Sequence, residues 1–210
     1  MLLTLFWSIY NEMNSKIGNK IRHNKDKKDK IKKDIVYTPE EVAKDCIKYT
    51  LPFLKEEDIL LEPFSGKDVF YNNFPETNKK DWCEIERGRD YLESDIKCDW
   101  VITNPPYSII NDILPKLFEC NKGFCLLVNN LTLTPLRLKK INNAGFYISF
   151  IYYFKIWEWF GYQFYFIFEK RADKKNIPEM IFSGKNYRDI NKQKKSKTKA
   201  NSKPNSCKKK

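Results

Sequence analysis

The chain has 210 residues, which gives room for one domain of about 100–200 residues with extensions. With 41% hydrophobic and 15% aromatic residues, it has enough apolar material to form a packed core. The apolar start, Met1 to Tyr10, is too short to span a membrane, and no basic segment precedes it as a secretory signal would require.

The net charge of +12 is unevenly distributed along the chain. Residues 14–34 carry nine Lys/Arg against three acids, and residues 171–210 carry fourteen against three. The middle, 35–170, holds sixteen Lys/Arg and twenty Asp/Glu, a net charge of −4. The basic ends fit a polyanionic partner, because lysines gain affinity by releasing counterions from a phosphate backbone. A disordered, solubilising extension would have the same composition.

These patterns predict three regions. Residues 1–34 form a basic N-terminal extension, disordered or partly helical, residues 35–172 form a folded domain, and residues 173–210 form a Lys-rich tail that is mostly disordered. None of the six cysteines forms a Cys-x-x-Cys pair, and the single histidine, His23, lies in the basic extension, so no metal site is expected. Cysteines within apolar runs, such as Cys125, are typical of reduced thiols in an intracellular, cytoplasmic protein.

The folded domain alternates helix and strand signals, which predicts an α/β sheet with crossover helices. Thr38, Pro39 and the two acids that follow have the pattern of an N-cap, a first helical residue and a first turn, and the helix extends to about residue 49. The other elements expected, in chain order, are strand 59–61, a helix ending near residue 73, strand 81–85, strand 100–103, helix 108–120, strand 123–128, helix 133–142, and a hairpin of strands 146–157 and 162–168 with Gly161 in its turn.

The tetrapeptide Asn104-Pro105-Pro106-Tyr107 follows a buried strand and is the most informative motif in the chain. Two consecutive prolines fix φ and lack an N–H group, so this strand exit is stiff and cannot extend a sheet ladder. An Asn and a Tyr on such an exit form a preorganised pair at the place where open α/β sheets bind ligands.

Four further motifs accompany the tetrapeptide. In chain order the five motifs are Tyr37-Thr38-Pro39, Leu61-Glu62-Pro63-Phe64-Ser65-Gly66, Trp82-Cys83-Glu84-Ile85, Gly88-Arg89-Asp90-Tyr91 and Asn104-Pro105-Pro106-Tyr107. This order resembles the S-adenosylmethionine (SAM)-dependent amino-methyltransferases, in particular the DNA N6-adenine methyltransferase family and its small phage and viral members. The resemblance covers residues 35 to about 170. It implies a Rossmann-like methyltransferase fold: a mostly parallel central sheet with helices on both faces and a C-terminal antiparallel β-hairpin.

The resemblance also implies site residues. The loop at Gly66 would hold the methionine part of SAM, Glu84 would accept hydrogen bonds from the two ribose hydroxyls, and Asp90 would contact the adenine amine of the cofactor. The cofactor-binding residues expected are Tyr37, Thr38, Pro39, Glu62, Pro63, Phe64, Gly66, Glu84, Asp90 and Asn104. The catalytic residues expected are Asn104, Pro105, Pro106 and Tyr107, with Tyr107 and Phe160 stacking on the target base. Trp159 is the alternative to Phe160, and aromatic residues that only form the core of the hairpin would give the same pattern.

One position departs from the family pattern. The glycine loop usually has a second glycine two residues after the first, and this chain has Asp68 there. A carboxylate at that position would repel the carboxylate of SAM unless Lys67 or the ammonium group of the ligand compensates. The departure leaves open a weakened or inactive member of the family.

The chemistry implied is direct methyl transfer from the sulfonium to an exocyclic amine. The Asn104 side-chain oxygen and the Pro105 carbonyl would bind the two amine hydrogens and turn the lone pair toward the methyl group. The expected substrate is the N6 amine of adenine in double-stranded DNA, reached by base flipping, with the Lys-rich ends on the phosphate backbone. Adenine in RNA, a glutamine amide in a protein, and a catalytically inactive nucleic-acid-binding protein remain as alternatives.

Overall fold

The computed structural model describes residues 36–175 and 178–188. These residues divide into two compact units, one of Val36 with Pro106–Ile110 and the other of Tyr37–Pro105 with residues 111–175 and 178–188. The described part of the first unit contains the 3-10 turn Tyr107–Ile109, in which the N–H of Ile109 donates to the carbonyl of Pro106 (3.4 Å). The expected N-terminal extension, 1–34, lies outside the described residues.

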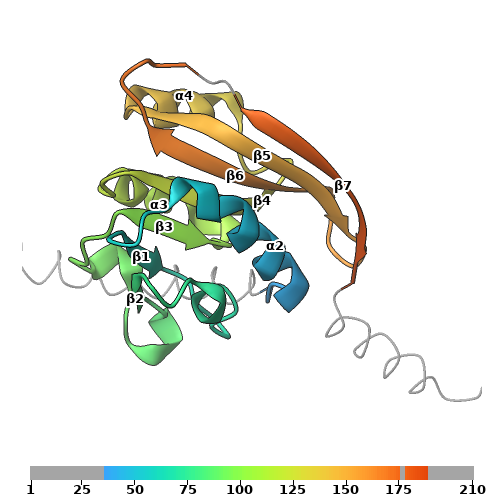
Figure 1. Ribbon diagram of the computed structural model, residues 1–210, viewed down its shortest axis with the longest axis horizontal. Coiled ribbons are helices and arrows are strands. Elements are labelled where there is room, and N and C mark those ends of the chain that lie inside the picture. Colours follow the sequence, from blue (N-terminus) through green and yellow to red (C-terminus); the bar gives the residue numbers. More distant parts are fainter. Residues whose placement is uncertain (1–35, 176–177, 189–210) are drawn as a thin grey trace, which may run out of the picture. The chain divides into compact units, whose positions relative to one another are not determined.

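The second unit contains a seven-stranded sheet with the strand order β2-β1-β3-β4-β6-β5-β7 (Figure 1). The strands are β1 Ile59–Glu62, β2 Lys79–Trp82, β3 Trp100–Thr103, β4 Gly123–Asn129, β5 Phe146–Ile156, β6 Gln163–Lys170 and β7 Glu179–Tyr187. The pairs β1/β2, β1/β3, β3/β4 and β5/β7 are parallel, whereas β4/β6 and β5/β6 are antiparallel. The mostly parallel sheet with an antiparallel β5–β6 hairpin is therefore confirmed.

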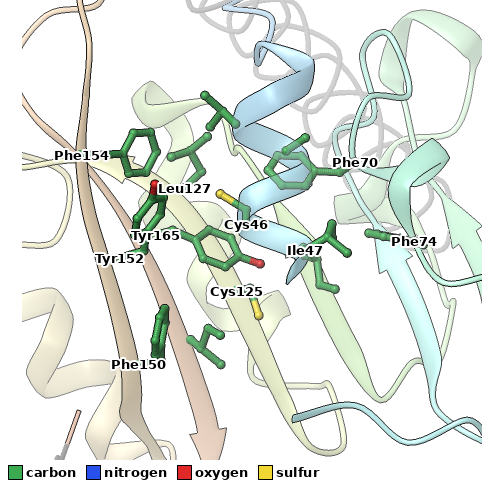
Figure 2. Packing of buried hydrophobic residues seen from close by; sticks show 14 of the residues in the cluster. Cys46, Ile47, Phe70, Phe74, Cys125, Leu127, Phe150, Tyr152, Phe154 and Tyr165 are labelled. Carbon is green, nitrogen blue, oxygen red and sulfur yellow. The ribbon is translucent and has the colours of Figure 1, made fainter. Parts of the chain in front are cut away.

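Helix α2, Glu40–Thr50, covers one face of this sheet (Figure 1). Its Val42, Ala43, Cys46 and Ile47 are buried in a core with large aromatic side chains of the central strands. Figure 2 shows Cys46 and the ring of Tyr165 side by side in this core. The apolar residues of α2 recur at helical spacing, so they form one stripe that is buried against the sheet. The two acids of the first turn, Glu40 and Glu41, lie outside this stripe and are exposed.

On the opposite face lies Phe118, the residue that follows helix α3 (Ile110–Leu117). The centre of the Phe118 ring lies 6.4 Å from the centre of the Phe124 ring in β4 and 6.0 Å from that of the Phe146 ring in β5. A β-bulge between Ile148 and Phe150 reverses the side-chain alternation of β5, so Phe146 lies on this face and Phe150 lies in the α2 core. Helix α4, Pro135–Asn143, precedes β5. No helix of the described ranges is long and apolar enough to cross a membrane.

Three predicted elements differ from the structure. The segment predicted as a helix ending near residue 73 consists of turns and the 3-10 turn Tyr71–Asn73, because it is too short and too rich in Asn for a stable helix. The second strand ends at Trp82 rather than residue 85, so Glu84 lies just beyond it. Thr38 is not the N-cap of α2; Pro39 occupies that position with an extended backbone (ψ 142°).

Strand β7 lies within the segment predicted to be a disordered tail. It pairs in parallel with β5, from Phe150↔Glu179 to Ile156↔Tyr187. The sheet therefore extends beyond the domain boundary expected at residue 172. Residues 189–210 of the predicted tail lie outside the described residues.

The strand directions bring several chain segments to one edge of the sheet. The parallel strands β1, β2 and β3 end together, with Glu62 paired to Trp82 and Leu61 paired to Val101. Because β6 runs antiparallel to β4 and pairs Gln163 with Asn129, the β5–β6 turn lies at this same carboxyl edge. The chain passes from β2 back across β1 to β3, so the switch point of the sheet lies between β1 and β3.

At the opposite edge the buried carboxylate of Asp58 joins several strands. It accepts hydrogen bonds from the indole N–H of Trp100 (3.0 Å) and the N–H of Lys55 (3.1 Å), and it pairs with Lys122. Asn78 donates to the carbonyl of Asp58 (3.1 Å). Burial raises the pKa of Asp58, but these donors outweigh it and hold the pKa below its ordinary value.

Gly123 is required at the start of β4. A Cβ atom there would lie 2.3 Å from the carbonyl oxygen of Phe168 and 2.5 Å from the ring of Trp100. Both obstacles are fixed, one by the β4/β6 ladder and one by the hydrogen bond to Asp58.

We expect Gly123→Ala to destabilise the fold by about 1–3 kcal/mol, because a well-packed site must shift to accommodate the methyl group. The free energy of unfolding from urea titration measures this loss. Gly184→Ala is the matched control, since a Cβ atom at Gly184 meets nothing within 4 Å. Equal stability of the two variants would contradict the expected clash.

Candidate cofactor and amine site

The loops that follow β1 and β2 are joined by hydrogen bonds beyond the ends of the strands. The N–H of Cys83 donates to the carbonyl of Glu62 (2.9 Å), and the N–H of Ser65 donates to the carbonyl of Cys83 (3.0 Å). The N–H of Gly66 then donates to Oε2 of Glu84 (2.8 Å). The two loops, 62–68 and 83–90, thus form one connected structure at the carboxyl edge.

Gly66 has φ +50°, in the left-handed region, and a Cβ atom there would lie 3.4 Å from the ring of Tyr37. The backbone therefore turns sharply at Gly66, which is exposed and has no side chain to keep a ligand away from the loop. Lys67 lies with its Nζ 4.4 Å from the centre of the Tyr37 ring. Pro63 is buried, and Phe64 packs edge-on against Tyr91 at 5.6 Å.

Glu62 is buried, with 2% of its surface exposed, and its Oε2 accepts from the N–H of Tyr71 (2.7 Å). Burial raises the pKa of Glu62 well above its ordinary value. The neighbouring carboxylates of Asp68 and Glu84 raise it further, and the Tyr71 hydrogen bond and Arg87 act in the opposite direction. At the end of β1, burial and the neighbouring carboxylates thus disfavour the ionised form of Glu62.

Glu84 lies just beyond the carboxyl end of β2, as the N-cap of the 3-10 turn Ile85–Arg87. Its two oxygens accept from the N–H groups of Gly66 and Glu86, the latter at 3.2 Å. Each carboxylate oxygen has a second lone pair, so further hydroxyl donors can be accepted. Asp90 caps the short turn Tyr91–Glu93 by accepting from the N–H of Leu92 (3.0 Å).

Asp68 has a partner that the sequence did not reveal. It is bound by Arg87 rather than by Lys67, with Nη1 3.1 Å from Oδ2 and Nη2 2.6 Å from Oδ1. Nη2 of Arg87 also donates to the hydroxyl of Ser65. The residues are nineteen positions apart, and a spacing of that kind carries no local signal for an ion pair.

Asn104 follows β3 directly and is held by a residue from the start of the domain. Its Nδ2 donates to the hydroxyl of Thr38 (3.2 Å), and Thr38 is 9% exposed. This bond turns the nitrogen end of the amide toward Thr38 and the oxygen end away from it. Thr38 therefore orients the Asn104 amide instead of capping α2. Pro105 is buried next to Asn104.

The other two members of the tetrapeptide, Pro106 and Tyr107, belong to the first unit. Pro106 is the N-cap of the 3-10 turn that Tyr107 begins. Their roles toward a substrate stay predictions.

The β5–β6 turn carries exposed aromatic side chains at the carboxyl edge. Phe160 is 78% exposed, whereas its neighbour Trp159 is buried at 7%. Phe160 is therefore the side chain of this pair that is available to a ligand. Trp157 and Tyr162, on either side, are also exposed, at 54% and 51%.

No protein-family model matches the sequence, and no curated protein matches it. Solved structures do match. Magnesium protoporphyrin IX methyltransferase from Synechocystis, crystallised with SAM, aligns with a TM-score of 0.52 and 10% identity over 63% of this chain and 79% of its own. The 23S rRNA methyltransferase ErmE aligns with a TM-score of 0.52 and 11% identity over 66% of this chain and 70% of its own.

A candidate RNA methyltransferase from Pyrococcus horikoshii also aligns, with a TM-score of 0.52 and 17% identity over 63% of this chain and 85% of its own. At such identities the likeness concerns the course of the backbone. The chain has the Rossmann-like methyltransferase fold.

Because the pKa of Glu62 is raised in the folded state, the free energy of unfolding should depend on pH. The folded state keeps the proton on Glu62 above the ordinary glutamate pKa of about 4.3, where the unfolded state has lost it. The wild-type protein therefore loses stability as the pH rises from there through the folded pKa, and the loss is complete above it.

We expect Glu62→Gln, which can still accept from the Tyr71 N–H, to be more stable than the wild type at high pH and equally stable near pH 4. Urea titrations of both proteins across this range measure the difference. A difference that stays constant with pH would contradict the assignment to Glu62.

Proposed function

We propose that this chain is a SAM-dependent methyltransferase acting on the N6 amine of adenine in DNA, with the target base flipped out of the duplex. The observation that carries the proposal is the placement of Asn104 and Pro105 at the end of β3, beside the connected loops after β1 and β2. This is the switch point of the sheet, where α/β folds bind ligands.

The residues present suit the cofactor. SAM carries a sulfonium, an ammonium and a carboxylate, a net charge of about +1, and the loops supply the carboxylates of Glu62, Asp68 and Glu84 with the guanidinium of Arg87. The open backbone at Gly66 would hold the methionine part, Glu84 the ribose, and Asp90 the adenine. When bound, SAM supplies an electrophilic methyl group on its sulfur.

Asn104 and Pro105 would orient the amine. The exocyclic nitrogen of adenine is a poor nucleophile because its lone pair is delocalised into the ring. Accepting its two hydrogens on the Asn104 oxygen and the Pro105 carbonyl directs the lone pair outward and stabilises the positive charge that develops on it. An amide serves better than a carboxylate here, since it adds no full negative charge next to the sulfonium. The Thr38 hydrogen bond holds the amide in the required sense.

A nucleic acid substrate is supported by the aromatic turn. Phe160 lies at the same edge of the sheet as Asn104, and its exposed ring suits stacking on a base that has left the helix. Tyr107, which follows Pro106 in the tetrapeptide, is a further aromatic residue that would stack on a base. The fourteen Lys/Arg of residues 171–210 suit contacts to phosphates.

We expect Asn104→Ala to lower kcat for methyl transfer by about 100- to 1000-fold, the usual cost of removing one preorganised hydrogen-bonding group from an active site. Transfer of a radiolabelled methyl group from SAM to unmethylated DNA, RNA and protein measures both the rate and the substrate class. The control is Asn143→Ala, which truncates an exposed Asn at the end of α4. Thr38→Val should show a smaller loss, because the amide stays in place but is less firmly held.

Incorporation into DNA that survives Asn104→Ala would contradict the mechanism. Incorporation into RNA or protein in place of DNA would move the proposal to that substrate. No incorporation, together with no SAM binding by calorimetry, would instead favour an inactive nucleic-acid-binding protein.

The tail generates a separate prediction. Replacing the nine lysines of residues 189–210 by Gln should flatten the dependence of log Kd for DNA on log salt by about 0.9 for each lysine that contacts a phosphate. Fluorescence anisotropy at several salt concentrations measures the slope. An unchanged slope would show that the tail does not contact the DNA.

A further inference from the structure

Asp68 occupies a backbone conformation that favours glycine. Its φ is +60°, one of two positive φ values among the described residues other than glycine. Asp and Asn tolerate this left-handed region better than other residues with a side chain, so the turn is kept at modest cost. The position brings a carboxylate into the loop 62–68.

Arg87 holds this carboxylate with a fixed geometry. Its fork binds both oxygens of Asp68 and the hydroxyl of Ser65, and its guanidinium lies 3.9 Å from the centre of the Trp82 ring. Bidentate pairing and stacking on an aromatic face make this contact firmer than an ordinary surface ion pair. Arg87 thereby ties the loop after β1 to the loop after β2.

We propose that Arg87 is a positioning residue for the cofactor. The positive charge of Arg87 offsets the negative charge of Asp68, so loop 62–68 can bind the α-carboxylate of SAM without repelling it. This inference rests on the proposed function, in which loop 62–68 holds the methionine part. With Arg87 in place, the guanidinium offsets the negative charge of the Asp68 carboxylate, and the loop can accept the carboxylate of SAM as well. Without Arg87, the Asp68 charge acts unopposed on the carboxylate of the ligand.

The chain contains a matched control in Arg89. Its guanidinium lies 4.4 Å from the centre of the same Trp82 ring and pairs with Asp81 at 2.7 Å. The side chains of Arg87 and Arg89 are each 37% exposed. Arg89→Ala therefore removes a comparable stacking contact and ion pair but leaves the Asp68 loop untouched.

Two ligands separate the electrostatic effect from a structural one. S-adenosylhomocysteine carries the amino-acid group with its carboxylate, and 5′-methylthioadenosine has the same nucleoside without it. Calorimetry should show S-adenosylhomocysteine binding to Arg87→Ala about tenfold more weakly than to the wild type, a change of about 1.4 kcal/mol. Binding of 5′-methylthioadenosine should change by less than about twofold, and Arg89→Ala should change neither ligand by more than this.

The Asp68 side of the pair supplies an independent arm. Asp68→Asn keeps Arg87 and removes the negative charge, so it should tighten S-adenosylhomocysteine several-fold and leave 5′-methylthioadenosine unchanged. In the Arg87→Ala background, Asp68→Gly should restore most of the lost affinity.

Three results would overturn the inference alone: an equal loss of both ligands in Arg87→Ala, no recovery on adding Asp68→Gly, or the same loss in Arg89→Ala. A wild-type protein that binds neither ligand would overturn the proposed function, and with it this inference.

Discussion

The buried Asp58 carboxylate sets the register on which the site depends. It accepts a hydrogen bond from Trp100 of β3 and forms an ion pair with Lys122, which precedes β4. The backbone carbonyl of Asp58 accepts from Asn78, which precedes β2. Strands β1, β2 and β3 are four residues long, so fixing them at one edge fixes where they end at the other. A slip by one residue would exchange the faces of every side chain and move the strand exits out of line.

The chemistry proposed at the carboxyl edge follows from this register. Glu62 ends β1, Glu84 follows β2 and Asn104 follows β3, and the parallel pairing of these strands brings their ends to one edge. Burial raises the pKa of Glu62 in this site, and the nearby carboxylates of Asp68 and Glu84 raise it further, whereas Arg87 acts in the opposite direction. A ligand with a net positive charge would be attracted by these carboxylates.

Much of the fold could be predicted from the sequence. The apolar runs separated by turn residues predict strands β1 to β4 in their chain order. The β5–β6 hairpin is predictable because its two strands are rich in β-branched and aromatic residues. Strand β7 was not predictable, because Glu179–Tyr187 has little apolar alternation and pairs with a strand nearly thirty residues earlier through contacts that a local pattern does not encode. Glu62, Glu84 and Asn104 could be placed at the carboxyl edge because each lies at or just after the end of a strand, and the roles given to them stay predictions. Arg87 and the role of Thr38 were missed, because their partners, Asp68 and Asn104, lie far away in sequence.

The pairing of β7 with β5 has a consequence for where the chain can be shortened. Composition suggests a cut at residue 172, in front of a segment that looks like a solvated tail. Such a cut would leave β5, eleven residues long and rich in Phe, Tyr and Ile, as an uncovered edge strand. It would also remove Tyr187, whose hydroxyl lies 2.5 Å from that of Tyr152 in the core. An exposed edge of this length and composition is a template for pairing between molecules, so a chain cut at residue 172 is expected to aggregate more readily than one that keeps β7.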